Sequence, residues 1–207
     1  MKDGQLVYVA DPMCSWCWGF SPVIDSVRDH FGGKLPVRLL LGGLRPGTTE
    51  AMDEATKSMI SEHWGHVQER TGQPFDFAFF DRERFVYDTE PPSRAIVAAR
   101  QNSLDTAFDL IKRIQSAFYA ENGDVTDRDI LGDLAVESGM DREAFAELFD
   151  SEEMKQETLD DFAASRRAGI NGFPALIAGS DSEGYEVITI GYRPWEEVEP
   201  LITSWLE

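Results

Sequence analysis

The chain has 207 residues, of which 42% are hydrophobic and 11% aromatic, so it can bury a core without disulfides or a structural metal. Its 38 acidic residues against 19 basic ones give a formal net charge of -19, which repels phosphate backbones and anionic lipid surfaces. We therefore expect neither nucleic acid nor a membrane as a partner. The acidic residues are spread along the chain, which favours a solvated surface over a docking face for a basic partner.

Targeting signals are not apparent in the sequence. No segment approaches the roughly 20 apolar residues that span a bilayer, and the N-terminus lacks the apolar stretch and small-residue cleavage site of a signal peptide. We accordingly expect a cytoplasmic protein. In that compartment two cysteines are not expected to form a stabilising disulfide, and the only two, Cys14 and Cys17, are spaced C-x-x-C. This spacing indicates that the two cysteines have a chemical role and not a stabilising one.

The first fifty residues predict a strand, a helix and a second strand. Residues 5–10 form a short β-rich apolar run that ends at Asp11-Pro12. From Cys17 to Phe31 apolar residues recur at spacings of three and four, and Gly32-Gly33 end the helix pattern. Residues 35–41 predict the second strand, with a turn-rich segment at 42–47. The cysteines therefore lie at the start of a helix, directly after a strand.

A helical block is predicted from Thr48 to about Gly169. The aromatic segment 75–80 within it is expected to pack as a loop, and Thr126 with Asp129 resembles a capping box. Helices are expected over residues 50–70, 93–102, 104–120, 127–138 and 151–168.

Strand signals return after Gly172. Residues 175–178 and 185–190 predict two strands joined by the turn 179–184, and residues 193–206 predict a last amphipathic helix. The order describes an α/β fold that a large all-helical insertion interrupts. We expect its first half at residues 1–47, the insertion at 48–150 and its second half at 151–207.

The C-x-x-C pair suits disulfide exchange because of its place on the helix. Free backbone N–H groups and the positive end of the helix dipole favour a thiolate at Cys14, the predicted nucleophile. One helical turn brings Cys17 alongside, so that it can resolve a mixed disulfide. We therefore predict Cys14 and Cys17 as catalytic residues, with no cofactor beyond their own redox-active disulfide.

Two other interpretations of the pair remain open, a zinc half-site and two core cysteines. A zinc site needs two further ligands, and the only histidines are His30, His63 and His66. We expect no metal. His63 lies on the predicted apolar face of helix 50–70 with Met52, Met59, Ile60 and Val67, either as a core residue or, if this helix covers the cysteines, as a group that tunes the thiolate.

The second informative element is Gly172-Phe173-Pro174-Ala175, which places a proline at the first residue of a strand. Proline removes a ladder donor and is therefore expected there only at a strand start, an edge or a cis turn. Periodicity alone does not decide between an ordinary trans proline and a cis one.

Together, these residues resemble the DsbA-like branch of the thioredoxin superfamily over essentially the whole chain. Its FrnE-like predicted disulfide isomerases also carry an aspartate ahead of the cysteines and a tryptophan between them. The resemblance implies a thioredoxin fold with a cis Pro174 against the Cys14 sulfur, and a Phe173 backbone free to pair with an extended substrate. It also implies that Trp16, Trp18 and Phe173 line a groove. Trp18 is equally compatible with the core.

The dipeptide between the cysteines departs from the periplasmic oxidants of that family. Ser15-Trp16 offers no histidine to stabilise the reduced thiolate, so we expect a poise nearer the reducing end of the superfamily range of about −120 to −270 mV. The expected activity is reduction or isomerisation of disulfides, with a disulfide-containing protein or a small thiol as substrate. An electron-donor thiol system is expected to reduce the cysteine pair again. The alternatives are a glutathione-dependent transferase or isomerase of the kappa-like group and a non-catalytic zinc- or partner-binding module.

Overall fold

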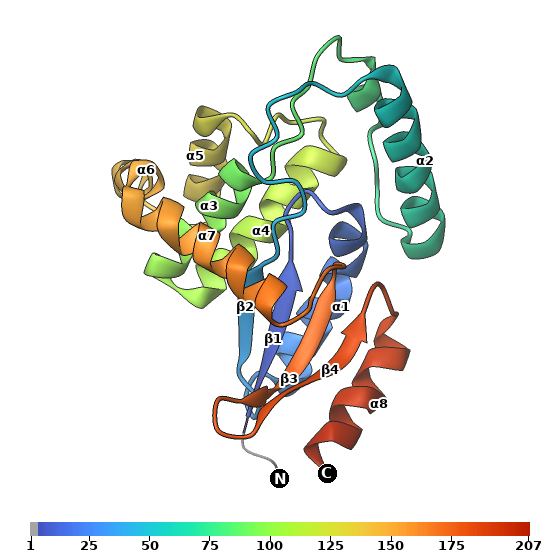
Figure 1. The fold of residues 1–207 in the computed structure, drawn as a ribbon, viewed down its shortest axis with the longest axis vertical. Helices are drawn as coiled ribbons and strands as arrows, with labels where there is room; N and C mark the ends of the chain where they lie inside the picture. Colours follow the sequence, from blue (N-terminus) through green and yellow to red (C-terminus); the bar gives the residue numbers. More distant parts are fainter. Residues whose placement is uncertain (1–3) are drawn as a thin grey trace.

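Four strands form one mixed sheet with the order β2-β1-β3-β4 (Figure 1). The computed structural model describes residues 4–207. The central strand β1 (Gln5–Ala10) runs parallel to β2 (Val37–Leu41) and antiparallel to β3 (Ala175–Ser180), and β4 (Gly184–Ile190) pairs with β3 at the edge. Side chains of β1 are buried on both faces of the sheet, in two separate hydrophobic clusters.

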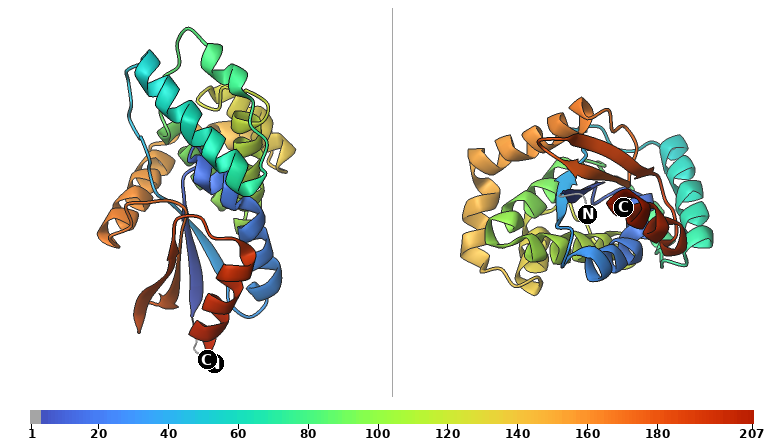
Figure 2. Two further views of the ribbon diagram at one scale, coloured as in Figure 1. Left: turned by 90° about the vertical axis from the view of Figure 1, so that its right-hand side faces the viewer. Right: turned by 90° about the horizontal axis from the view of Figure 1, so that it is seen from below.

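Two helices from opposite ends of the chain cover one face of this sheet, as the left view of Figure 2 shows. They are α1 (Ser15–Phe31), which follows β1, and α8 (Trp195–Leu206), which follows β4. The predicted helix 193–206 begins two residues late because Pro194 is its N-cap. Within residues 4–207, no helix combines the length and the apolar character that crossing a membrane requires.

The remaining helices gather at one end of the sheet, at the top of Figure 1. The last of them, α7 (Glu152–Arg167), packs against α3 (Glu90–Asn102) and β2, and it leads the chain back to β3. The expectation of an α/β fold with a large helical insertion is thereby confirmed. The helices at this end of the sheet are α2 (Glu54–Thr71), the 3₁₀ helix η1 (Phe77–Asp81), α3 (Glu90–Asn102), α4 (Leu104–Tyr119), α5 (Arg128–Glu137), α6 (Arg142–Asp150) and α7 (Glu152–Arg167).

Helix starts differ from the sequence prediction where capping or proline chemistry decides them. Helix α2 begins four residues later than predicted, because the Asp53 carboxylate accepts a hydrogen bond from the Thr56 N–H at 2.8 Å. Helix α3 begins three residues earlier than predicted and includes Pro91 and Pro92, whose missing N–H groups cost nothing in a first turn.

Three further predictions within the insertion need correction. Asp127, not Thr126, caps α5, since its carboxylate accepts hydrogen bonds from the N–H groups of the second and third helical residues. The helix α6 was not among the predicted elements; its nine residues begin after Asp141, which caps it in the same way. The segment expected as an aromatic loop contains η1.

Trp64 anchors α2 to the rest of the insertion. Its ring centroid lies 5.1 Å from that of Phe79, 5.7 Å from that of Phe118 and 5.0 Å from that of Tyr119. The buried residues of α2 are Lys57, Ile60, Trp64 and Val67. The predicted apolar face was therefore wrong in part: Met59 and His63 are exposed. Because an α-helix turns about 100° per residue, residues three, four and seven positions from Trp64 share its buried face, whereas Met59 and His63 do not.

Truncation of Trp64 should release α2. We expect Trp64→Ala to lower the free energy of unfolding by about 3–5 kcal/mol, because it removes a fully buried aromatic side chain. Urea unfolding followed by circular dichroism measures this change.

Met59→Ala on the same helix is the matched control, since 45% of this side chain is exposed. It should change the free energy of unfolding by less than about 0.5 kcal/mol. Equal losses in the two variants would contradict the assignment of the buried face.

Candidate active site

The two cysteines occupy unequal positions at the first turn of α1, and both are free thiols. Cys14 is the N-cap residue, and its carbonyl accepts hydrogen bonds from the Cys17 and Trp18 N–H groups at 2.9 and 3.1 Å. Cys14 is 7% exposed, whereas Cys17 is fully buried. A disulfide approaching from outside therefore meets the sulfur of Cys14 and not that of Cys17.

Burial raises the pKa of the Cys17 thiol well above its ordinary value. The neighbouring Cys14 adds to this pKa shift through a hydrogen bond and through its charge, while the backbone N–H of Asp11 opposes it. Cys17 is therefore a protonated thiol at neutral pH, and it needs to lose this proton before it can act as a nucleophile.

The carboxylate of Asp11 fixes the backbone around the pair. One oxygen accepts a hydrogen bond from the Met13 N–H at 2.9 Å, and the other accepts one from the Leu44 N–H at 2.7 Å. The first bond shapes the turn into Cys14, and the second ties this turn to the segment after β2. Asp11 is fully buried, and desolvation raises its pKa to about 6 despite the opposing effect of the two amides.

The segment before β3 closes the site from the other side. The Phe173–Pro174 peptide bond is cis, as the resemblance implied, and the Cys14 thiol donates to the Phe173 carbonyl oxygen with an Sγ–O distance of 3.6 Å. The Phe173 ring lies over Gly42, where an added Cβ would come within 2.1 Å of its edge. Glycine at this position is therefore what lets Phe173 approach the cysteines.

Two cavities that share lining residues form the groove at this site, and Cys14 lines the first of them. The first, of about 290 Å³, is lined by Cys14 and Arg45 together with residues of α2, including His63. The second, of about 350 Å³, is lined by Arg70 and Tyr192. Trp16 and Phe173 line both cavities. The structure thus brings the predicted substrate-binding residues Trp16 and Phe173 to the cysteines, with Pro174 buried behind them.

Other residues singled out in the sequence take different positions. Trp18 belongs to the core, where it stacks on Tyr119 and donates from Nε1 to the Pro74 carbonyl oxygen at 3.0 Å. His66 and His30 are exposed and line neither cavity. Among residues 4–207, no three side chains of His, Cys, Asp or Glu come together in a group that could hold a metal ion.

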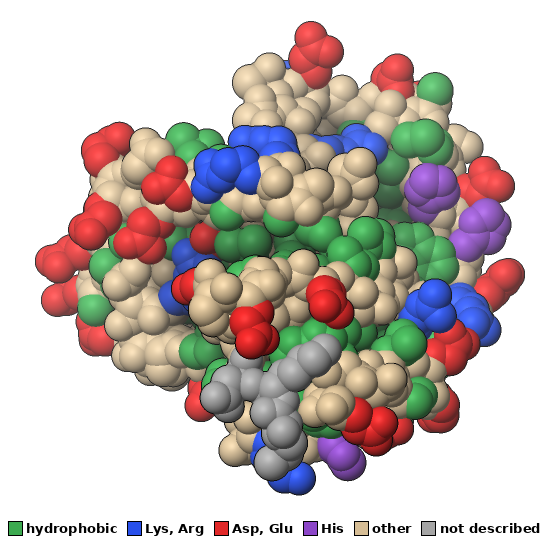
Figure 3. Space-filling view, turned by 60° about the horizontal axis from the view of Figure 1, so that its bottom comes forward, with side chains coloured by type: hydrophobic (Ala, Val, Ile, Leu, Met, Phe, Trp, Pro, Cys, Tyr) green, Lys and Arg blue, Asp and Glu red, His purple; other side chains and the backbone are tan. Residues whose placement is uncertain are grey.

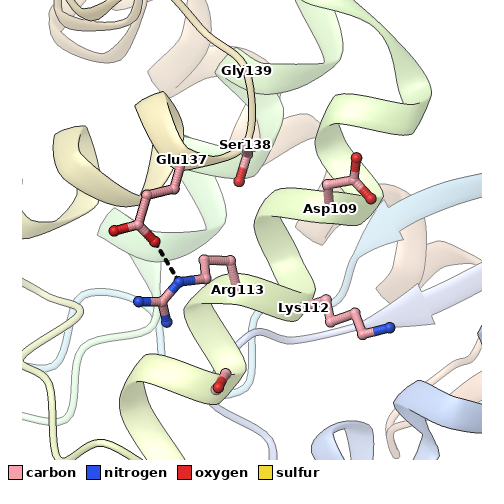
Figure 4. Close-up of a pocket in the computed structure, with 7 residues that line it drawn as sticks. Asp109, Lys112, Arg113, Glu137, Ser138 and Gly139 are labelled. Atoms are coloured by element: carbon pink, nitrogen blue, oxygen red, sulfur yellow. Dashed lines mark hydrogen bonds and ion pairs between the residues drawn. The ribbon is translucent and has the colours of Figure 1, made fainter.

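A larger cavity of about 570 Å³ lies away from the cysteines, between α4 and the end of α5 (Figure 4). Its cations are paired with acids: Arg113 pairs with Glu137 and Glu121, and Lys112 pairs with Asp25, while the lining Asp109 forms no ion pair among the described residues. No cysteine lines it. The groove over Cys14 is therefore the better candidate for chemistry.

Comparison with known proteins assigns the family. The model of the DSBA-like thioredoxin domain matches residues 5–202. The chain belongs to the DSBA-like thioredoxin domain family. This result confirms the predicted thioredoxin fold with a helical insertion and the resemblance from which it was drawn.

Solved structures of family members are similar over nearly the whole chain. A Nitrosomonas europaea protein, assigned provisionally as a protein disulfide isomerase, is 39% identical with a TM-score of 0.92, covering 99% of this chain and 98% of that one. The cytosolic disulfide reductase DsbM from Pseudomonas aeruginosa is 28% identical with a TM-score of 0.79, covering 98% of both chains. A curated relative, the ClpXP adapter protein SpxH of Bacillus subtilis, is 20% identical, covering 95% of this chain and 67% of that protein.

Several residues at the site were not identified from the sequence. Arg45 lay in a segment recognised only as a turn, and Tyr87 lay between predicted helices. The Tyr87 hydroxyl donates to the Met13 carbonyl oxygen at 2.7 Å, 74 positions away in the chain. The two glycines before Leu44 were the one available signal, since paired glycines indicate close backbone approach.

The pKa of Asp11 predicts a specific pH dependence of stability. A carboxyl group whose pKa rises from 3.8 to about 6 on folding stabilises the native state below pH 3.8, and this contribution is lost as the pH rises through 6. We expect the difference in unfolding free energy between wild type and Asp11→Asn to fall by about 2 kcal/mol between pH 4 and pH 7. Urea unfolding at a series of pH values measures it.

Asp53→Asn is the control with the opposite sign. Hydrogen bonds from Thr56 lower the pKa of Asp53, so its contribution to stability is present at neutral pH and is lost on acidification. Parallel pH curves for wild type and Asp11→Asn would contradict the raised pKa of Asp11.

Proposed function

We propose that the protein is a cytoplasmic thiol–disulfide oxidoreductase that reduces or rearranges disulfides, with Cys14 as nucleophile and Cys17 as resolving thiol. The observation that carries the proposal is the unequal pair: one sulfur reaches a groove and the other is sealed behind it. The similarity to DsbM, named as a cytosolic disulfide reductase, supports the compartment and the direction.

The reaction proceeds in two exchanges. The Cys14 thiolate, stabilised by the N-terminus of α1, attacks a substrate disulfide and releases one thiolate, which leaves a mixed disulfide. Cys17 then loses its proton and attacks the Cys14 sulfur, which releases the second substrate thiolate and forms the Cys14–Cys17 disulfide. Two electrons pass to the substrate, and the proton of Cys17 goes to the leaving thiolate.

An external thiol then has to reduce the Cys14–Cys17 disulfide. Glutathione is our proposed donor, because a DsbM structure was determined with GSH and is 29% identical to this chain. The same donor can reach Cys14 through the groove, whereas Cys17 stays closed to it.

Trp16, Phe173 and Pro174 are the proposed substrate-binding residues. Among the described residues, no hydrogen bond involves the Phe173 N–H. This free donor, next to Cys14, supports pairing with the backbone of an extended substrate segment. Trp16 and Phe173 offer apolar surface to such a segment.

A second role, as an adaptor, is favoured by the curated relatives named as ClpXP adapter proteins. An adaptor recognises its partner through a surface and does not need exchange at Cys14. Binding to ClpXP that persists in the Cys14→Ser/Cys17→Ser variant, in a protein without reductase activity, would support this role.

Loss of the resolving thiol should trap the intermediate. We expect Cys17→Ser to form a stable mixed disulfide with insulin or glutathione and to reduce insulin at the background rate, because no second sulfur can release Cys14. Non-reducing gels and mass spectrometry detect the adduct.

The comparison variant is Cys14→Ser, which should form no adduct and have no activity. Full turnover by Cys17→Ser without an adduct would exclude the dithiol mechanism. Glutathione conjugation that survives Cys17→Ser would instead favour the transferase alternative.

The Ser15-Trp16 dipeptide should set a reducing poise. We expect Trp16→His to raise the reduction potential by roughly 30 mV or more, because an imidazolium stabilises the Cys14 thiolate of the reduced form. Equilibration with glutathione buffers, followed by alkylation and mass measurement, gives the potential. Trp16→Phe, which keeps an apolar ring, should stay near wild type; a wild-type potential near −120 mV would overturn the reductive assignment.

A further inference from the structure

The groove over Cys14 has a charge opposite to that of the whole protein. The chain has 38 acidic residues and a net charge of -19, yet no Asp or Glu lines either cavity of the groove. The charged or titratable side chains that do line them, apart from Cys14 and two tyrosines, are Arg45, Arg70 and His63. The nearest buried acid, Asp11, lines neither cavity and is held by two backbone amides.

The two arginines line different cavities of the groove. Arg45 lines the cavity that Cys14 also lines, and Arg70 lines the second cavity, which shares Trp16 and Phe173 with the first. Neither guanidinium forms an ion pair with a carboxylate of the described residues, whereas Arg94, Arg100 and Arg113 all do. In a protein with twice as many acids as bases, two unmatched arginines beside one groove are available for an outside anion.

Tyrosine rings hold both arginines in place. The Arg45 guanidinium carbon lies 5.3 Å from the centroid of the Tyr87 ring, and the Tyr87 hydroxyl donates a hydrogen bond to the Met13 carbonyl oxygen. The Arg70 guanidinium carbon lies 6.0 Å from the centroid of the Tyr192 ring, which in turn lies 5.9 Å from the Trp16 ring. Each cation thus rests on an aromatic face that contacts the segment bearing the cysteines, and such faces position a cation while leaving its N–H donors free.

In Figure 3, hydrophobic side chains gather in the middle of the face shown, with Lys and Arg side chains above and to the right of them and acidic side chains both beside them and around the outline. A guanidinium binds a carboxylate or a phosphate with two parallel hydrogen bonds, and carboxylates are the anionic groups of common biological disulfides such as glutathione disulfide.

We propose that this groove selects disulfides that carry carboxylate groups, and that Arg45 and Arg70 bind those carboxylates. The proposal rests on the thiol–disulfide activity proposed above and names its substrate class. Cys14 attacks the substrate disulfide as before, and the arginines take no part in bond making. They are specificity-determining residues.

Three small disulfides with one skeleton separate this proposal from the effect of overall charge. They are 3,3′-dithiodipropionate, bis(2-hydroxyethyl) disulfide and cystamine, in which each sulfur carries a two-carbon chain ending in a carboxylate, a hydroxyl or an ammonium group. Pre-reduced protein is mixed with each at pH 7, and its loss of thiols is followed by quenching and alkylation. Each second-order rate constant is divided by that of dithiothreitol with the same disulfide, which corrects for the acidity of the leaving thiol.

If the arginines govern selection, the corrected rate constant is largest for the dicarboxylate and smallest for cystamine. We expect a ratio of roughly tenfold between the dicarboxylate and the neutral disulfide, typical of a charged hydrogen bond. This ratio should fall towards one in Arg45→Gln and should shrink with added salt. Arg45→Glu should reverse the order. Arg70→Gln should lower the rate for glutathione disulfide, whose carboxylates lie further from its sulfur atoms.

Lys34→Gln is the matched control. Lys34 is exposed, lies just beyond the C-terminal end of α1 and forms no ion pair among the described residues, so this variant also removes one unpaired positive charge. It should leave every ratio unchanged. Because ratios are compared within one preparation, a general loss of activity cancels. Fastest reaction with cystamine, or equal ratios in wild type, Arg45→Gln and Arg70→Gln, would overturn the selectivity. Failure to react with all three disulfides would instead overturn the proposed function.

Discussion

The buried carboxylate of Asp11 is the interaction on which the geometry of the site depends. It accepts one hydrogen bond from the turn that leads into Cys14 and one from the segment after β2, so two loops from neighbouring parallel strands are joined through a single side chain. The second loop carries Gly42, which admits Phe173, and Arg45, which borders the groove. The helical insertion contributes Tyr87, whose hydroxyl donates a hydrogen bond to the Met13 carbonyl oxygen in the turn that leads into Cys14. Burying this carboxylate costs free energy, as its raised pKa of about 6 indicates, and the two amide bonds offset part of that cost.

Charge acts on two scales in this protein. The excess of acidic residues acts at long range, where it repels nucleic acid and other acidic proteins and is screened by salt. Close to Cys14 the local side chains decide the potential instead, because Coulomb interactions strengthen as distance and water content fall. A net charge of -19 consequently says little about which small molecules a partly enclosed groove accepts.

The sequence was sufficient for the placing of Cys14 and Cys17 and for the order of the elements other than η1 and α6, since these follow from local signals: apolar periodicity, glycine and proline turns, and one motif. Its errors came from competition between such signals. The cap of α5 was assigned to Thr126 when the adjacent Asp127 offers a stronger acceptor, and His63 was placed on a buried face that Trp64 determines. Arg45 and Tyr87 could not be assigned, because their place at the site results from contacts between segments distant in the chain. No periodic pattern encodes such contacts.

The complete burial of Cys17 also bears on how the site withstands oxidants. Hydrogen peroxide and similar reagents convert an accessible thiolate to a sulfenic acid and then, irreversibly, to sulfinic and sulfonic acids. Cys14 is the sulfur they can reach, and a sulfenic acid formed there lies within one helical turn of a protected thiol that can condense with it to a disulfide. The closed environment of Cys17 therefore protects a thiol that can condense with the oxidised Cys14, and the product is the same disulfide that forms in the proposed reaction cycle.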